Sequence, residues 1–166
     1  MKPIQIAPLL DKILTSTYTT NDVYRRIRAL KQFLLNQLFA SAIQSFTSSS
    51  ESDSAWLSSL GTEFYAQFNQ QNIYQMIEAL EKQVKSIQPL IIYLPFEIPE
   101  GEVVRIGMKI RTDLGKNLLL NFKVDPTLIA GCAIVWNSQL RDYSARARIN
   151  QNKPQILSII KEYIHA

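Results

Sequence analysis

The sequence predicts an α+β fold of two small domains. Residues 1–88 are expected to form a helical bundle of about four to five helices, and residues 89–166 a small α/β domain of order β-α-β-β-β-α. Four of the five glycines and four of the seven prolines fall between residues 89 and 131. Apolar residues recur every three or four positions in the first half but form short runs rich in β-formers in the second, and these patterns are typical of helices and of strands respectively.

Four apolar stripes predict the helices of the first half, over residues 4–15, 21–46, 56–68 and 72–87. Thr19 or Thr20 is a candidate N-cap for the second of them, because a threonine oxygen can accept a free amide of the first turn. The polar run 47–54 predicts a loop. Each stripe must be buried against another helix or a partner.

In the second half, residues 90–94 and 118–124 predict strands. Between them, Pro99, Glu100 and Glu102 favour the start of a helix that ends at Gly115. Residues 131–137 and 139–146 predict a hairpin around Asn137 and Ser138, and residues 151–164 predict a final helix.

Composition disfavours most hydrolytic chemistry. With Cys132 as the only cysteine, the chain can form neither an internal disulfide nor a cysteine zinc cluster. With His165 as the only histidine, a histidine metal site or a Ser/His/Asp triad has little to rest on. The net charge of +4 is too small to indicate a nucleic-acid-binding protein by itself.

No motif in the sequence predicts an active site. The stretch from Gly101 to Gly107 lacks the Gly-Lys-Ser/Thr of a phosphate loop. Glu100 and Glu102 are interpreted as charges near a helix amino terminus. Ser144 has no activating base at a recognisable spacing, and Cys132 is interpreted as a buried, unreactive thiol. We therefore expect no catalytic, cofactor-binding or metal-ligating residues.

Arg141, Arg146 and Arg148 form the main basic run. Arg146 and Arg148 alternate with small or apolar residues, so in an extended chain they would share one face. That face could contact phosphates of a nucleic acid together with Lys153, or it could be a solvated surface that pairs with Asp142 or with a protein partner.

Two neighbouring segments are the most informative, Val-Asp-Pro-Thr-Leu-Ile-Ala-Gly at 124–131 and Asp-Tyr-Ser-Ala-Arg-Ala-Arg-Ile at 142–149. Asp125 and Pro126 end a strand, since the carboxylate can accept amides of the turn and proline presets the next φ angle. Gly131 permits a bend or a close backbone approach. These interpretations are structural.

As a pair, the segments resemble the C-terminal signature of the delta subunit of F-type ATP synthases, the oligomycin-sensitivity-conferring protein family. There, Val-Asp-Pro-Ser-Leu-Ile-Gly-Gly leads through a hairpin to Asp-Gly-Ser-Val-Arg-Gly-Arg-Leu. The positions that match are Asp125, Pro126, Leu128, Ile129, Gly131, Asp142, Ser144, Arg146 and Arg148. The departures are Thr127 for Ser, Ala130, Tyr143 and Ala147 for glycines, and Ile149 for Leu. The resemblance covers residues 90–166; over residues 1–88 it is one of architecture.

The resemblance implies a non-catalytic stator subunit without cofactor. The bundle would bind amino-terminal segments of the alpha subunits of the catalytic head, and the C-terminal domain would hold the b subunits of the peripheral stalk. The chain would lie peripherally at the cytoplasmic face of the membrane in a bacterial-type complex, with no membrane insertion, nucleic acid or small-molecule substrate. No signal or transit peptide pattern is seen.

Four aromatic residues are candidate partner-binding anchors, because aromatic side chains are enriched in interface hot spots. They are Trp56, Phe64, Tyr65 and Phe68, and core packing is the competing interpretation. Two other functions stay open, a nucleic-acid-binding α/β module using Arg141, Arg146 and Arg148, and a free-standing adaptor for other helices.

Overall fold

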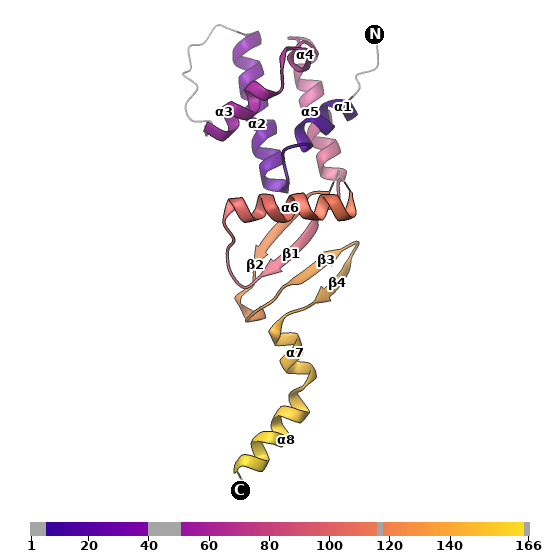
Figure 1. Ribbon diagram of the computed structural model, residues 1–166. Helices are drawn as coiled ribbons and strands as arrows, with labels where there is room; N and C mark the ends of the chain where they lie inside the picture. The colour runs from indigo at the N-terminus through magenta and orange to yellow at the C-terminus, as the bar shows by residue number, and fades with distance from the viewer. Residues whose placement is uncertain (1–5, 40–50, 116–117, 165–166) are drawn as a thin grey trace.

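The computed structural model describes residues 6–39, 51–115 and 118–164. Figure 1 shows a helical bundle at one end, a small sheet in the middle and two helices that extend away from the sheet at the other end. This is the α+β fold that the sequence predicts.

Five helices of the described residues form the bundle. They are α1 (Ile6–Leu14), α2 (Thr20–Leu38), α3 (Glu51–Ser59), α4 (Thr62–Tyr65) and α5 (Ile73–Ser86). The stripes of α1, α2 and α5 face one another, and Ile13, Leu30 and Leu80 are completely buried between them. Thr19 is the N-cap of α2, because its hydroxyl oxygen accepts the amide of Asp22 at 3.1 Å.

Two predicted helices differ from the observed ones. The stripe at 56–68 is divided into α3 and α4 by Gly61, whose φ of +79° ends the first helix and starts the second. Helix α3 starts at Glu51, within the predicted polar loop. Helix α2 ends at Leu38 instead of residue 46, and residues 40–50 lie outside the described part of the chain.

The second half contains a four-stranded sheet of order β2-β1-β3-β4. Strands β1 (Leu90–Leu94) and β2 (Leu120–Val124) are parallel, while β3 (Ala133–Trp136) is antiparallel to β1 and to β4 (Gln139–Asp142). The crossover helix α6 (Glu100–Leu114) ends at Gly115, as predicted. Its Ile106 and Ile110 pack on Leu90 and Ile92, forming a second, smaller core.

The end of the chain differs from the prediction. Strand β4 ends at Asp142 instead of residue 146, and two helices follow, α7 (Ala145–Gln151) and α8 (Lys153–Ile164). The alternation of Arg146 and Arg148 with small residues therefore lies on a helix and not on a strand. The physical reason is Ser144, whose hydroxyl oxygen accepts the amide of Ala147 at 3.1 Å and starts α7.

The bundle core generates a stability prediction. Leu80→Ala should lower the free energy of unfolding by about 2–5 kcal/mol, because it leaves a cavity among α1, α2 and α5. Urea denaturation monitored by circular dichroism measures this change. The control is Leu80→Met, which roughly conserves volume and should cost less than about 1.5 kcal/mol; equal losses for both variants would contradict the cavity explanation.

Candidate functional site

The two segments of the signature meet at one end of the sheet. The first continues from β2 into a short 3-10 helix, η1 (Pro126–Leu128), and the second leads from β4 into α7. Asp125 accepts the amide of Thr127 at 3.0 Å and its hydroxyl at 2.6 Å. Arg146 of α7 donates to the same Thr127 hydroxyl oxygen at 2.5 Å. Thr127, which replaces the serine of the family pattern, therefore joins the two segments.

Asp142 and Ser144 shape the turn from β4 into α7. One carboxylate oxygen of Asp142 accepts the amide of Ser144 at 2.9 Å, and the other lies 3.7 Å from the guanidinium of Arg146. Ser144 is fully buried, and its hydroxyl oxygen is engaged with the amide of Ala147. Its hydroxyl acts as a helix cap.

Close backbone contacts hold the segments together. The amide of Ala145 donates to the carbonyl of Ala130 at 2.9 Å, and the amide of Tyr143 donates to the carbonyl of Cys132 at 2.9 Å. Gly131 lies between Ala130 and Cys132, whose carbonyls accept these bonds. It has a φ of +80°, and a Cβ atom at this position would be 2.5 Å from the carbonyl oxygen of Tyr143. A glycine is required here for two reasons, the backbone angle and the lack of space.

Two hydrophobic signature residues differ in environment. Leu128 is 1% exposed and anchors η1, whereas Ile129 is 62% exposed. Ile129 also has a φ of +69°, a conformation that is strained for a β-branched residue. Its side chain is therefore presented to the surface beside the network of Asp125, Thr127 and Arg146.

Hydrogen bonds lower the pKa of both signature carboxyl groups. The hydroxyl of Thr127 is the main cause for Asp125, and the hydrogen bond from Ser144 is the main cause for Asp142, with Arg146 adding to both effects. Each group is a hydrogen-bond acceptor that stays ionised at neutral pH. This arrangement suits a structural turn better than proton transfer.

The basic residues do not gather on one face. Arg146 and Arg148 lie two positions apart on α7, so their side chains point to nearly opposite sides, about 160° apart around the helix axis. Arg146 is engaged with Thr127 and Asp142. Arg141 lies on the edge strand β4 and Lys153 at the start of α8. The shared face expected from an extended chain is absent from this described segment.

Three of the four candidate anchors are buried in the bundle. Trp56, Phe64 and Phe68 belong to its core, each 5% exposed. Tyr65 is half-buried, and its hydroxyl donates to the carbonyl of Leu57 at 2.6 Å. Its ring lies 5.0 Å from that of Phe33, and both line a mainly apolar hollow of about 230 Å³ together with Ser54, Leu57 and Ser58.

The structure exposes a surface that the sequence reasoning missed. Helices α7 and α8 bury none of their residues, and α8 extends away from the sheet (Figure 1). Its apolar stripe is therefore open to solvent; it comprises Ile156, Leu157, Ile159, Ile160, Tyr163 and Ile164. A signal was present in the sequence, since the apolar residues of 156–164 recur at one-, three- and four-residue spacing on one side of a helix.

Two further properties concern the described residues. No group of three or more His, Cys, Asp or Glu side chains in ranges 6–39, 51–115 and 118–164 is placed to hold a metal ion. None of the helices described there has the length and apolar character needed to cross a membrane.

Gly131 gives a test of the turn. Gly131→Ala should destabilise the protein by about 1–3 kcal/mol or more, because the added Cβ is strained at positive φ and collides with the carbonyl of Tyr143. The matched control is Gly61→Ala, which has a similar φ of +79° but no atom within 4 Å of the added Cβ. Chemical denaturation should show the larger loss for Gly131→Ala, and equal losses would argue against the close contact.

The pH dependence of stability gives a second test. Because the folded pKa of Asp125 and Asp142 lies below the ordinary value of 3.8, their contribution is complete above that value and is lost as the pH falls through the folded pKa. The melting temperature of the wild type should therefore drop more between neutral pH and strongly acidic pH than that of Asp125→Asn/Asp142→Asn. Parallel pH profiles would contradict this prediction.

Comparison with known proteins assigns the chain to a family. A family model described as the ATP synthase delta (OSCP) subunit matches residues 10–156. Among curated proteins, ATP synthase subunit delta of Alkaliphilus metalliredigens (strain QYMF) is 26% identical over 90 residues, 54% of this chain and 50% of the relative. ATP synthase subunit delta of Acidovorax sp. (strain JS42) is 30% identical over 63 residues, 38% and 35% of the two chains.

A third relative, ATP synthase subunit delta of Verminephrobacter eiseniae (strain EF01-2), is 26% identical over 81 residues, 49% of this chain and 44% of the relative. The chain thus spans half or less of the length of these relatives. The family model, in contrast, covers both the bundle and the sheet, together with the complete signature. By that match over most of its length, the chain belongs to the ATP synthase delta (OSCP) subunit family.

Proposed function

We propose that this chain is a non-catalytic subunit of the peripheral stalk of an F-type ATP synthase. In this role it links the catalytic head to the membrane-anchored stalk, so that the head cannot rotate with the central shaft and rotor torque drives ATP synthesis. The observation that carries the proposal is the family match over residues 10–156, which includes the network of Asp125, Thr127, Asp142, Ser144 and Arg146.

The engagement of the polar signature residues supports a non-catalytic role. Asp125, Asp142 and Ser144 use their side-chain oxygens to accept backbone amides. A general base or nucleophile would need one of these atoms to face a substrate within hydrogen-bond reach. We propose that the signature holds η1 and α7 in position and that its function is to present neighbouring surfaces.

Helix α8 is the proposed contact for the b subunits of the stalk. Its exposed stripe is long enough to pair with one amphipathic helix, a mode of recognition that reads apolar residues at three- and four-residue spacing. Two lysines flank the stripe, Lys153 at the start of α8 and Lys161 in its last turn. These charges favour a partner helix with acidic flanks.

The bundle is the proposed contact for the alpha subunits of the head. Among the four predicted anchors, Tyr65 has exposed surface beside the hollow that it shares with Phe33. Trp56, Phe64 and Phe68 would act from within the core by shaping that wall of the bundle. We keep residues 1–88 and 89–166 as the two proposed domains, because the bundle and the sheet each have a core, with Leu119 of the second half buried in that of the bundle.

We also propose a peripheral location on the cytoplasmic face of the membrane, within a bacterial-type complex. The chain would be held there by its protein partners, without inserting into the bilayer and without binding nucleic acid or a small-molecule substrate. The family assignment supports this location.

Affinity capture tests the proposal. The tagged full-length chain is incubated with detergent-solubilised membranes from its source cells, and bound subunits are identified by mass spectrometry. We expect recovery of alpha and b subunits by the wild type. Ile160→Asp should reduce b-subunit recovery by about tenfold or more, because it places a charge in the centre of the apolar stripe.

The control is Ser158→Asp, which adds the same charge on the polar side of α8 and should leave recovery unchanged. Recovery of nucleic acid alone, in a salt-sensitive manner, would overturn the stator proposal in favour of a module that uses Arg141, Arg146 and Arg148. Recovery of unrelated helical proteins without ATP synthase subunits would overturn it in favour of a free-standing adaptor.

A further inference from the structure

The two halves are in contact through α6, the segment after α1 and the residues at the start of β2, where Leu119 is buried in the bundle core. The guanidinium of Arg111, in the last turn of α6, donates to three backbone carbonyls. Nε donates to Leu118 at 3.1 Å, Nη1 to Leu14 at 2.6 Å, and Nη2 to Thr17. Leu14 and Thr17 belong to the bundle half, and Leu118 precedes β2, so one side chain connects both halves.

Arg111 also adds a hydrogen bond at the C-terminal end of α1. The last carbonyls of a helix have no partner within the helix, and they carry the negative end of its dipole. Leu14 is the last residue of α1 and is buried. The carbonyl of Leu14 accepts the amide of Thr17 at 3.1 Å, and Arg111, 97 positions later than Leu14 in the chain, adds a second donor and a positive charge.

Tyr18 and Gly107 complete the contact. The ring centroid of Tyr18 lies 4.6 Å from Cζ of Arg111, a cation–π arrangement. The same ring lies against Gly107, one turn earlier on α6, where an added Cβ would be 2.6 Å from ring atoms of Tyr18. A glycine in a helix interior costs about 1 kcal/mol relative to alanine, and the approach of the Tyr18 ring is the physical reason for one here.

The backbone of the same segment extends the sheet. The amide of Leu120 donates to the carbonyl of Tyr18 at 2.8 Å, and Thr19 forms a parallel bridge with Leu120 at the outer edge of β2. On the bundle side, the hydroxyl of buried Thr17 donates to the carbonyl of Ile13 at 2.7 Å. Residues 17–20 are thereby held by both halves.

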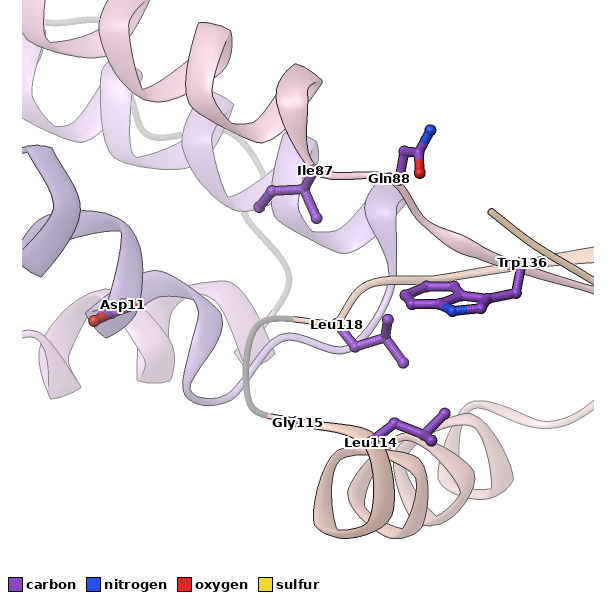
Figure 2. A pocket seen from close by; sticks show the side chains of 7 residues that line it. All are labelled: Asp11, Ile87, Gln88, Leu114, Gly115, Leu118 and Trp136. Carbon is purple, nitrogen blue, oxygen red and sulfur yellow. The ribbon is translucent and has the colours of Figure 1, made fainter. Parts of the chain in front are cut away.

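Leu119 adds an apolar contact with the bundle core, but another side of the junction is open. A cleft of about 620 Å³ separates the end of the bundle from the sheet, and Figure 2 shows Trp136 of β3 extending beside Leu118 toward Leu114. Ile87 and Gln88, on the connection between α5 and β1, line the same cleft. The packing of the two halves is therefore incomplete on this side, which gives more weight to the contacts of Arg111.

We propose that Arg111, seated on Tyr18 and Gly107, is a latch that sets the angle between the helical bundle and the α/β domain. A planar guanidinium can donate hydrogen bonds to three separated carbonyls at once. A lysine ammonium is a compact charge and fits such an arrangement less well. The latch is a property of this chain's own fold and does not depend on the proposed stator role. If the chain acts as a stator, the latch would make the link between its two ends stiff.

Distances between the halves, measured by double electron–electron resonance on the isolated full chain, test the latch. Spin labels are placed at Gln83→Cys on α5 and Gln139→Cys on β4, both exposed, in a Cys132→Ala background. The background protein should show one narrow distance distribution, and Arg111→Met should broaden it. The matched control is Arg105→Met, which removes an exposed arginine from the same helix and should change nothing.

Hydrogen exchange provides a second readout. The amide of Leu120, which donates to Tyr18, should exchange roughly tenfold faster or more in Arg111→Met while amides within the bundle core keep their protection. Arg111→Lys should give an intermediate rate. An exchange rate in Arg111→Lys equal to that of the wild type would show that a positive charge alone protects the Leu120 amide, and it would overturn the three-carbonyl latch.

A second pair of variants covers the case in which Arg111→Met does not fold. Gly107→Ala strengthens the helix propensity of α6 but displaces Tyr18, so it should broaden the distances as well. Gly101→Ala adds a Cβ to the same helix with no atom within 4 Å and should leave the distances narrow. A broad distribution in the background protein, or narrow ones in both Arg111→Met and Gly107→Ala, would overturn the proposal. Neither measurement involves ATP synthase, so failure of the latch is distinguishable from failure of the proposed function.

Discussion

The structure depends on the short segment at residues 17–20, whose backbone hydrogen bonds are shared between two cores. Thr17 is buried and bonded to α1, Thr19 caps α2, and the carbonyl of Tyr18 pairs with Leu120 next to β2. A buried carbonyl without a donor is costly, so the end of α1 can be buried here only if donors reach it. Those donors are the amide of Thr17, which reaches the carbonyl of Leu14, and the guanidinium of Arg111 on α6, which reaches the carbonyls of Leu14 and Thr17. Hydrogen bonds of a few backbone groups at the junction, together with the burial of Leu119 in the bundle core, thus hold the bundle against the sheet.

The residues of the C-terminal signature also form hydrogen bonds with backbone groups at turns. Its polar residues include two carboxylates, a serine and an arginine. In the fold each accepts or donates a bond that closes a turn, and Thr127 joins η1 to α7. The result is a rigid base from which the apolar stripe of α8 extends into solvent.

Several features could be predicted because they depend on neighbours in the sequence. The stripes of α2 and α5, the cap at Thr19, the stop at Gly115 and the turn at Asn137 and Ser138 are local, and the structure confirms them. The error at residues 143–146 arose because alternating small and basic residues fit a strand, while the cap at Ser144 favours a helix. Trp56, Phe64 and Phe68 show a similar limit, since a helical stripe of aromatics does not reveal whether a partner or the core covers it.

The sequence by itself determined the helical and α/β halves, the strand order along the chain and, through the residues of 124–131 and 142–149, the family. Only the tertiary structure decided how the halves are joined and what stays exposed. Arg111 reaches carbonyls 97 and 94 positions away, and Gly107 is needed because of the Tyr18 ring. Contacts at such separations leave no periodic or local pattern in one sequence, because they depend on where complete elements come to lie in space. The exposure of α8 has the same origin, since burial is decided by which elements are present to cover a stripe.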